Sequence, residues 1–439
     1  MEPYVLLLIV GVSFLIFLAT GTPIVFVLGG LSVVFITLYW GIMGVDSLSY
    51  AAFDTLTTPT LLALPLFLFM GNIIRYSGIG EDLFEMVDGW LGGINGGLAM
   101  GTVLICTLFA AMVGVAGAAT VTMAVVALPA MAKRGYHKHI YVGCIAAGGL
   151  LGLLIPPSIE MIVYSTISGV SVGRMYLGGV FPGLIMATLF VLYIGIRCHF
   201  NPQLGSARSE KISWGTRIKL LRNISLPGLL VLLILGGIYT GTFTPTEASG
   251  IGSAGAIIIA GIKRTLTRKM LDDSCKSTVR LIGMIFWLMI AASCFSQAVV
   301  TTKIGPWLTV TLGSMNMPFW IVLLGVMVIL MIMGTMMGDL TITLLMVPIA
   351  TPVMDAIGVD QVWFALLFVI NMITAWLTPP YGTSLFLMRL LVPEGVTMGD
   401  IYRSVLPFVT LMFFTLLLCA IFPGLVLYLP NLLLGGGIR

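Results

Sequence analysis

Long runs of apolar residues, separated by short polar segments, make up most of the chain. An apolar run of roughly 20 residues is long enough to cross a lipid bilayer as a helix. A helix also satisfies its backbone hydrogen bonds internally, as the bilayer core requires. We therefore expect membrane-crossing helices at about 4–20, 24–40, 59–74, 140–168, 177–198, 224–243, 247–262, 281–300, 361–392 and 405–429.

Two of these expected helices contain adjacent prolines. Pro156-Pro157 lies within 140–168, and Pro379-Pro380 lies within 361–392. Proline lacks a backbone donor and clashes with the preceding turn, so two in a row should open a helix. The freed carbonyl groups are costly in hydrocarbon unless another group binds them. Two broken helices at corresponding positions of two halves indicate a transporter with its binding site at the breaks.

Two further apolar stretches, 92–131 and 318–352, have centres of small or polar residues. These centres lie at 112–120 and 334–339. Small residues of this kind mark either tight packing between helices or the tip of a re-entrant hairpin. We favour one hairpin in each stretch.

The two halves of the chain share residues at a nearly constant offset of 222 to 226 positions. The matching pairs are Pro23 and Pro245, Pro129 and Pro352, Gly135 and Gly358, Pro156 and Pro379, Tyr176 and Tyr402, and Pro182 and Pro407. Each half then holds five crossings and one hairpin, and five is odd, so the second half must be inverted. The predicted fold class is an all-α polytopic membrane protein, an inverted repeat of five transmembrane helices plus one re-entrant hairpin each.

Composition supports a membrane protein, and charge placement orients it. Apolar residues make up 59% of the chain and charged residues only 9%, against about 25% charged in soluble proteins. With the N-terminus outside, 18 of the 21 Lys and Arg residues fall on the cytoplasmic side. Only Arg174, Lys303 and Arg439 fall outside. The positive-inside rule therefore predicts that both termini are periplasmic.

Some polar residues admit two interpretations. Segment 79–91 is amphipathic, so it is either an interfacial helix or an ordinary connecting helix. Glu247 follows Thr-Pro-Thr, and a structural role at a helix N-terminus is favoured over a functional one. His137 and His139 flank Lys138, and a solvated basic loop is favoured over a metal site.

Four spaced stretches carry a resemblance to a known family. They are Leu64–Gly71 (LPLFLFMG), Leu154–Ile159 (LIPPSI), Gly237–Ala248 (GIYTGTFTPTEA) and Leu377–Gly382 (LTPPYG). With the predicted topology, they make the chain resemble the large membrane subunit of tripartite ATP-independent periplasmic (TRAP) transporters, the DctM or SiaM type. The resemblance covers nearly the whole chain. It departs from the family at Val113–Ala118, which has no hydroxyl side chain, and at Glu160, where an apolar residue is expected.

This resemblance implies a function and an architecture. The family belongs to the ion-transporter superfamily and works as an elevator, in which hairpins and broken helices form a mobile transport domain beside a scaffold. Its members import organic acids, with sodium as the coupling ion and no other cofactor. The implied partners are a small four-helix membrane subunit, a periplasmic substrate-binding protein and the lipid bilayer of a bacterial inner membrane, and no nucleic acid.

The expected domains follow the repeat. Residues 1–91 are scaffold helices of the first repeat, and 92–198 hold its hairpin, broken helix and following span. Residues 199–223 form a cytoplasmic linker. Residues 224–317 are scaffold helices of the second repeat, and 318–439 hold its hairpin, broken helix and last span.

Opened helices and hairpin tips supply backbone carbonyls, which suit sodium, and helix C-termini add negative partial charge. We expect two sodium sites at equivalent places in the repeats. The first comprises Gly114, Val115, Gly117, Pro156, Pro157 and Ser158. The second comprises Gly334, Thr335, Gly338, Asp339, Thr378, Pro379, Pro380, Gly382 and Thr383.

Helix N-termini that follow the breaks suit an anionic substrate. Candidate substrate contacts are Ser158, Glu160, Thr383 and Ser384. Glu160 has either a structural or a gating role, and Asp339 either ligates sodium or pairs with a helix N-terminus. No catalytic constellation is present, so an enzyme is not expected. The alternative function is a stand-alone sodium–dicarboxylate symporter of the same superfamily.

Overall fold

The computed structural model describes residues 3–114, 116–207, 212–301, 307, 311 and 318–435. Within these ranges every regular element is a helix, which confirms the predicted all-α class. Val115, Lys303 and Arg439, all named above, lie outside the described residues.

Helices of the first half correspond closely to the apolar runs. They are α1 (Pro3–Ala19), α2 (Ile24–Trp40), α3 (Val45–Thr57), α4 (Ala63–Tyr76), α5 (Ile79–Leu91), α6 (Gly97–Val113), α7 (Ala116–Lys133), α8 (Lys138–Gly148), α9 (Ile159–Ser168) and α10 (Val172–Phe200). Those of the second half are α11 (Trp214–Tyr239), α12 (Pro245–Ile262), α13 (Arg268–Thr301), α15 (Phe319–Met336), α16 (Asp339–Ala356), α17 (Gln361–Leu377), α18 (Thr383–Leu391), α19 (Met398–Ile421) and α20 (Gly424–Leu433).

Six helical segments of the described chain are long and apolar enough to cross a membrane. They are Pro59–Tyr76, Val172–Phe200, Arg268–Thr301, Phe319–Met336, Asp339–Ala356 and Met398–Ile421. The bent helix α11 brings the number to seven. Several expected crossings are shorter, such as the 17-residue α2 and α17. Helix length therefore establishes a polytopic membrane protein, without establishing ten crossings.

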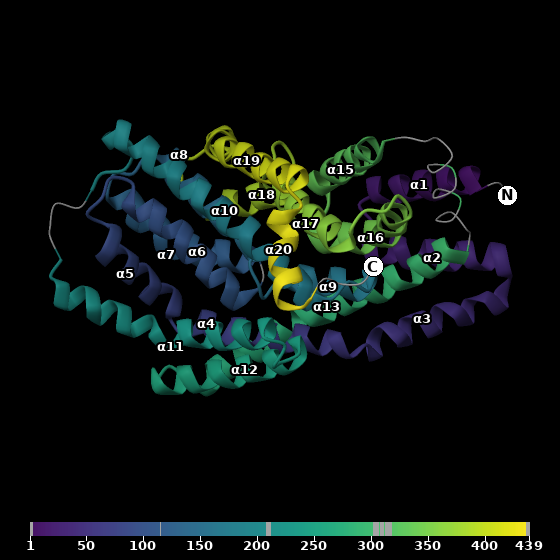
Figure 1. The fold of residues 1–439 in the computed structure, drawn as a ribbon, viewed down its shortest axis with the longest axis horizontal. Coiled ribbons are helices and arrows are strands. Elements are labelled where there is room, and N and C mark those ends of the chain that lie inside the picture. The colour runs from purple at the N-terminus through teal and green to yellow at the C-terminus, as the bar shows by residue number, and fades with distance from the viewer. Residues whose placement is uncertain are drawn as a thin grey trace.

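The helices form an elongated molecule (Figure 1). Helices α11 and α12 run along its lower edge in that view, and α19 and α15 along its upper edge. α12 packs against α4, and α13 packs against α2, α3 and α4. α8 packs against α6, α7 and α19. One group of helices thus packs around α4 and α13, and another packs around α8.

Several elements differ from the sequence-based expectation, and one of them is α11, which begins at Trp214 within the expected linker 199–223. Helix α3 was not expected, because its residues are too polar to form an apolar run. Helix α13 starts at Arg268, within a segment expected to be polar and loop-like, because Lys, Arg and Asp are tolerated in an exposed helical turn. The last span is divided into α19 and α20 beside Pro423.

Helix α5 has the bounds that its amphipathic pattern predicts. Its buried side includes Leu83, Phe84 and Val87, and the helix packs against α6 and α11. Packing on neighbouring helices fits the connecting-helix interpretation. The prediction for Glu247 is also confirmed, because its carboxylate accepts from the backbone N–H of Thr244 at 2.8 Å in a capping box.

Candidate functional site: a cavity between hairpins and broken helices

The tip of the first hairpin rests on the first helix break. Gly114, between α6 and α7, has a φ of +68°, a conformation that favours glycine. A Cβ at this position would lie 3.0 Å from the carbonyl oxygen of Pro157. The carbonyl oxygen of Gly114 accepts a hydrogen bond from the backbone N–H of Ile159 at 3.4 Å. The structure therefore brings Gly114 and Pro157 together, as the expected first ion site requires.

Ser158 organises the restart of the helix after this break. Its hydroxyl donates to the carbonyl oxygen of Leu153 at 2.7 Å and accepts from the backbone N–H of Met161. It is the N-cap of α9 and is fully buried. Tyr176 of α10 donates its hydroxyl hydrogen to the carbonyl oxygen of Ser158 at 3.4 Å. The Ser158 side chain is therefore committed to the backbone in this structure.

The second break has an equivalent arrangement. Tyr402 of α19 donates its hydroxyl hydrogen to the carbonyl oxygen of Pro380 at 3.0 Å. Sequence comparison of the halves pairs this tyrosine with Tyr176, which makes the same kind of bond at the first break. The backbone N–H of Gly382 donates to the carbonyl oxygen of Thr378 at 3.1 Å. A Cβ on Gly382 would collide with the carbonyl oxygen of Trp376, so only glycine fits this turn.

The second hairpin consists of α15 and α16, with its turn at Met337-Gly338. Gly334 packs closely against α17, since a Cβ built on it would lie 2.6 Å from the Cβ of Ala375. The hydroxyl of Thr335 donates to the carbonyl oxygen of Ile332. Asp339 is the first residue of α16.

Each hairpin packs against the broken helix of the other half. α16 of the second hairpin packs against α9, the half-helix after the first break. α7 of the first hairpin packs against α18, the half-helix after the second break. This packing brings Asp339 close to Glu160, because Asp339 lies in the first turn of α16 and Glu160 lies in the first turn of α9.

Gly114, Gly117, Glu160 and Asp339 line one cavity of about 210 Å³. Glu160 is only 1% exposed, and its Oε1 accepts from the hydroxyl of Thr343 at 2.7 Å. The carboxyl groups of Glu160 and Asp339 interact directly with each other. Two acidic groups at membrane depth indicate a functional site by default.

The cavity contains residues that the sequence analysis did not single out. They include Leu68 of α4, Leu281, Met284 and Ile285 of α13, and Trp376 at the end of α17. Two of these residues could have been found from the sequence. Leu68 belongs to one of the stretches that resemble the family, and Trp376 lies three residues before Pro379. α13 offers no such signal.

Other candidate residues lie away from this cavity. Thr383 is exposed, whereas Ser384 is buried and its hydroxyl has no hydrogen-bond partner among the described residues. Neither lines the cavity around Glu160, nor do Ser158, Thr378 or Pro379. The structure thus joins the first hairpin and first break to the second hairpin, and Trp376, just before the second break, also lines the cavity.

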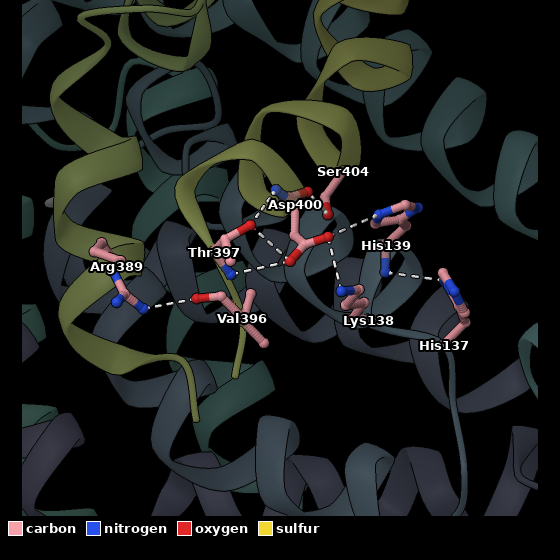
Figure 2. A network of polar contacts seen from close by, with 8 residues as sticks. All are labelled: His137, Lys138, His139, Arg389, Val396, Thr397, Asp400 and Ser404. Atoms are coloured by element: carbon pink, nitrogen blue, oxygen red, sulfur yellow. Dashed lines mark hydrogen bonds and ion pairs between the residues drawn. The ribbon is translucent and has the colours of Figure 1, made fainter. Parts of the chain in front are cut away.

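A polar network fastens α8 to α19 (Figure 2). Asp400 Oδ1 lies 2.7 Å from Lys138 Nζ, and its other oxygen accepts from the backbone N–H of Thr397 at 3.0 Å. His137, the N-cap of α8, accepts from the backbone N–H of His139. These residues therefore serve helix ends and an ion pair between two helices.

The end of the first hairpin, just before this network, is held by further polar contacts. Arg134 forms a two-pronged ion pair with Asp88 of α5, at 2.5 and 2.7 Å. The hydrogen bond to Asp88 raises the pKa of Arg134. Tyr136 accepts from the backbone N–H of Leu98, and burial raises its pKa to about 12. The base of the hairpin is thus held by fixed charges and a neutral hydroxyl.

Paired hairpins that meet broken helices around a shared cavity define a membrane transport protein. Residues 11–425 match the family described as "Tripartite ATP-independent periplasmic transporter, DctM component". The chain belongs to this family, which consists of transporter permeases and not enzymes.

The relatives agree with this assignment. The C4-dicarboxylate TRAP transporter large permease protein DctM of Pseudomonas aeruginosa is 32% identical over 401 residues, covering 88% of this chain and 90% of the relative. The isethionate TRAP transporter permease protein DctMQ of Oleidesulfovibrio alaskensis is 28% identical, covering 94% of this chain and 65% of the relative. The crystal structure of the Alcanivorax borkumensis YdaH transporter matches the fold with a TM-score of 0.67 at 15% identity, covering 94% of this chain and 98% of that one.

Proposed function

We propose that this permease imports an organic acid, a C4-dicarboxylate or a related carboxylate or sulfonate, by sodium-coupled symport. The observation that carries the proposal is the cavity where Gly114, Glu160 and Asp339 meet. A hairpin tip, a helix break and a second hairpin converge there, so movement of these elements together would change access to the cavity. This is the relationship that an elevator mechanism requires.

Sodium coupling has a physical basis in the same elements. Gly114 and Pro157 present backbone carbonyls close together at the first break, and Thr378 and Pro380 present them at the second. Each positive charge that moves inward gains about 2.3 kcal/mol per 100 mV of membrane potential. Two sodium ions would therefore drive the import of an acid against its gradient.

The proposed topology has five crossings and one re-entrant hairpin in each half, with both termini periplasmic in the inner membrane. The distribution of Lys and Arg supports it. A hollow of about 550 Å³ is lined by Arg75, Lys276 and Arg280, which are among the residues assigned to the cytoplasmic side. This hollow shares Gly117 and Leu281 with the Glu160 cavity and would serve as the release route.

The proposed partners are a small four-helix membrane subunit and a periplasmic binding protein that delivers the substrate. The family description as tripartite supports both. The relative named DctMQ, of which this chain covers 65%, supports the small membrane subunit.

Uptake into proteoliposomes tests the proposal. The permease, its small subunit and its binding protein would be reconstituted with a radiolabelled acid and an inward sodium gradient. We expect uptake only when all three proteins and sodium are present. Uptake by this chain alone would favour the stand-alone symporter, and equal uptake with potassium would refute sodium coupling.

A further inference from the structure

The hollow beside the Glu160 cavity has a basic lining. Three basic residues and one acidic residue line it, which gives a net charge of +2. They are Arg75 at the end of α4 and Asp273, Lys276 and Arg280 of α13. Charge of one sign around a hollow raises the local concentration of ions of the opposite sign. The lining therefore suits an anion.

Two of the three basic side chains have no acidic partner. Lys276 pairs with Asp272 at 2.5 Å. Within the described chain, neither Arg75 nor Arg280 forms an ion pair, and the guanidinium of Arg75 lies 5.6 Å from the ring of Tyr76. A guanidinium presents its donors in a planar fork that matches the two oxygens of a carboxylate. Two such groups on one hollow suit an acid with two carboxylates.

The hollow lies between two groups of helices. Its basic side chains belong to α4 and α13, whereas Gly117 and Val121 of α7 and Leu387 of α18 line another part. Gly117 is in the first turn of α7, so the positive end of that helix dipole lies at the hollow. In the proposed elevator, α7 and α18 move and α4 and α13 stay. The acid would then meet the two arginines only while its cavity adjoins this hollow.

We propose that Arg75 and Arg280 form a second binding site for the carboxylates of the substrate, which the acid occupies between the Glu160 cavity and the cytoplasm. The inference rests on the proposed function and its topology, and adds a site on the release route. The hollow and the cavity share Gly117 and Leu281, so the two spaces adjoin. Acid that accumulates in the cytoplasm would rebind at this site, and import would slow as the product accumulates.

Protection of a thiol in the hollow tests the site without transport. Ser277 lines the hollow, so Ser277→Cys places a thiol there, and Cys275→Ser removes the exposed native thiol from the background. The purified permease in phosphatidylcholine nanodiscs is alkylated with N-ethylmaleimide while succinate is titrated. We expect succinate to slow the alkylation saturably. Succinamide, which has the same shape and no charge, should give no protection.

Substitution of the arginines assigns the protection to them. Arg75→Gln and Arg280→Gln should each raise the half-maximal succinate concentration about tenfold or more, because each removes charge-assisted hydrogen bonds. Arg268→Gln is the matched control, since Arg268 is an exposed residue of α13 that does not line the hollow. No protection in the parent protein, or the same half-maximal concentration in all three variants, overturns the proposal.

Two further arms keep the result specific. Val121→Cys places a second probe on α7, in case Ser277→Cys itself disturbs the hollow. Arginine also binds the phosphate of lipid headgroups, so the assay is repeated in phosphatidylglycerol nanodiscs. Protection by phosphatidylglycerol alone, with no effect of succinate in phosphatidylcholine, would assign the hollow to a lipid and overturn the proposal.

The reconstituted transporter measures the consequence. Unlabelled acid loaded inside the proteoliposomes should inhibit sodium-driven uptake. Arg280→Gln should raise the inhibitory internal concentration about tenfold and leave the KM for external acid unchanged. An unchanged inhibitory concentration overturns the proposal. Failure of sodium-driven uptake in the wild type would count against the proposed function instead, because the protection assay needs no transport.

Discussion

The hydroxyl of Tyr176 lies 3.4 Å from the carbonyl oxygen of Ser158 and donates its hydrogen to it. The second repeat has the same relationship, where Tyr402 donates to the carbonyl oxygen of Pro380. In each half, a tyrosine of the long helix after the break thus donates to a carbonyl oxygen at the second proline or directly after it. These bonds give the weak sequence match between the two tyrosines a structural meaning.

Tyr176→Phe should therefore destabilise the protein. The lost bond leaves a buried carbonyl without this donor, and a cost of about 1 kcal/mol is typical. Tyr402→Phe should cost less, because Tyr402 is only partly buried. Melting temperature in detergent measures the effect, with Tyr50→Phe as a control, since Tyr50 is 75% exposed. Equal melting temperatures for Tyr176→Phe and Tyr50→Phe would contradict the role of this bond.

Gly114→Ala should impair transport. The alanine would have to keep a φ of +68°, and this conformation strains an L-residue by about 1 kcal/mol or more. It would also bring a Cβ within 3.0 Å of the carbonyl oxygen of Pro157. We expect initial sodium-driven uptake to fall roughly tenfold. Gly250→Ala is the matched control, because a Cβ there meets nothing within 4 Å, and comparable loss in both variants would refute a specific role for the hairpin tip.

Replacement of both prolines at the first break, Pro156→Ala with Pro157→Ala, should let α8 and α9 approach a continuous helix. Alanine restores the backbone donors and removes the steric clash. We expect sodium-dependent uptake to disappear while the amount of protein in the membrane stays unchanged. Pro227→Ala, within α11, removes a helix proline outside the breaks and should retain uptake. Normal uptake by the double variant would show that the break is not required.

Asp400→Ala should weaken the connection between α8 and α19. Asp400 completes the capping box with Thr397 and pairs with Lys138 (Figure 2). The variant loses the bond from the backbone N–H of Thr397 to the Asp400 carboxylate and the ion pair with Lys138, while the Thr397 hydroxyl still caps α19. Asp272→Ala removes an exposed pair with Lys276 and should change stability by less than about 0.5 kcal/mol. Thermal unfolding of the two variants compares these effects, and an equal loss would argue against the network.

Much of the fold is readable from the apolar pattern. The bounds of α2 and α5 are those that the pattern predicts, and the two proline breaks and two hairpins lie where expected. Helix α3 and the first turns of α13 were not predicted, because exposed polar residues form helical turns without leaving an apolar run. Helix length alone does not fix the number of crossings, since the expected crossings α2 and α17 have only 17 residues each.

By itself, the sequence determined the membrane class, the breaks, the repeat and the resemblance to the TRAP permease family. Only the tertiary structure decided that Glu160 meets Asp339, that Trp376 and Met284 share their cavity, and that Thr383 lies elsewhere. The physical reason is that helical periodicity shows which face of a helix is apolar, without showing which helix covers that face. Here the hairpin of one half covers the broken helix of the other, and this crossing assembles the site.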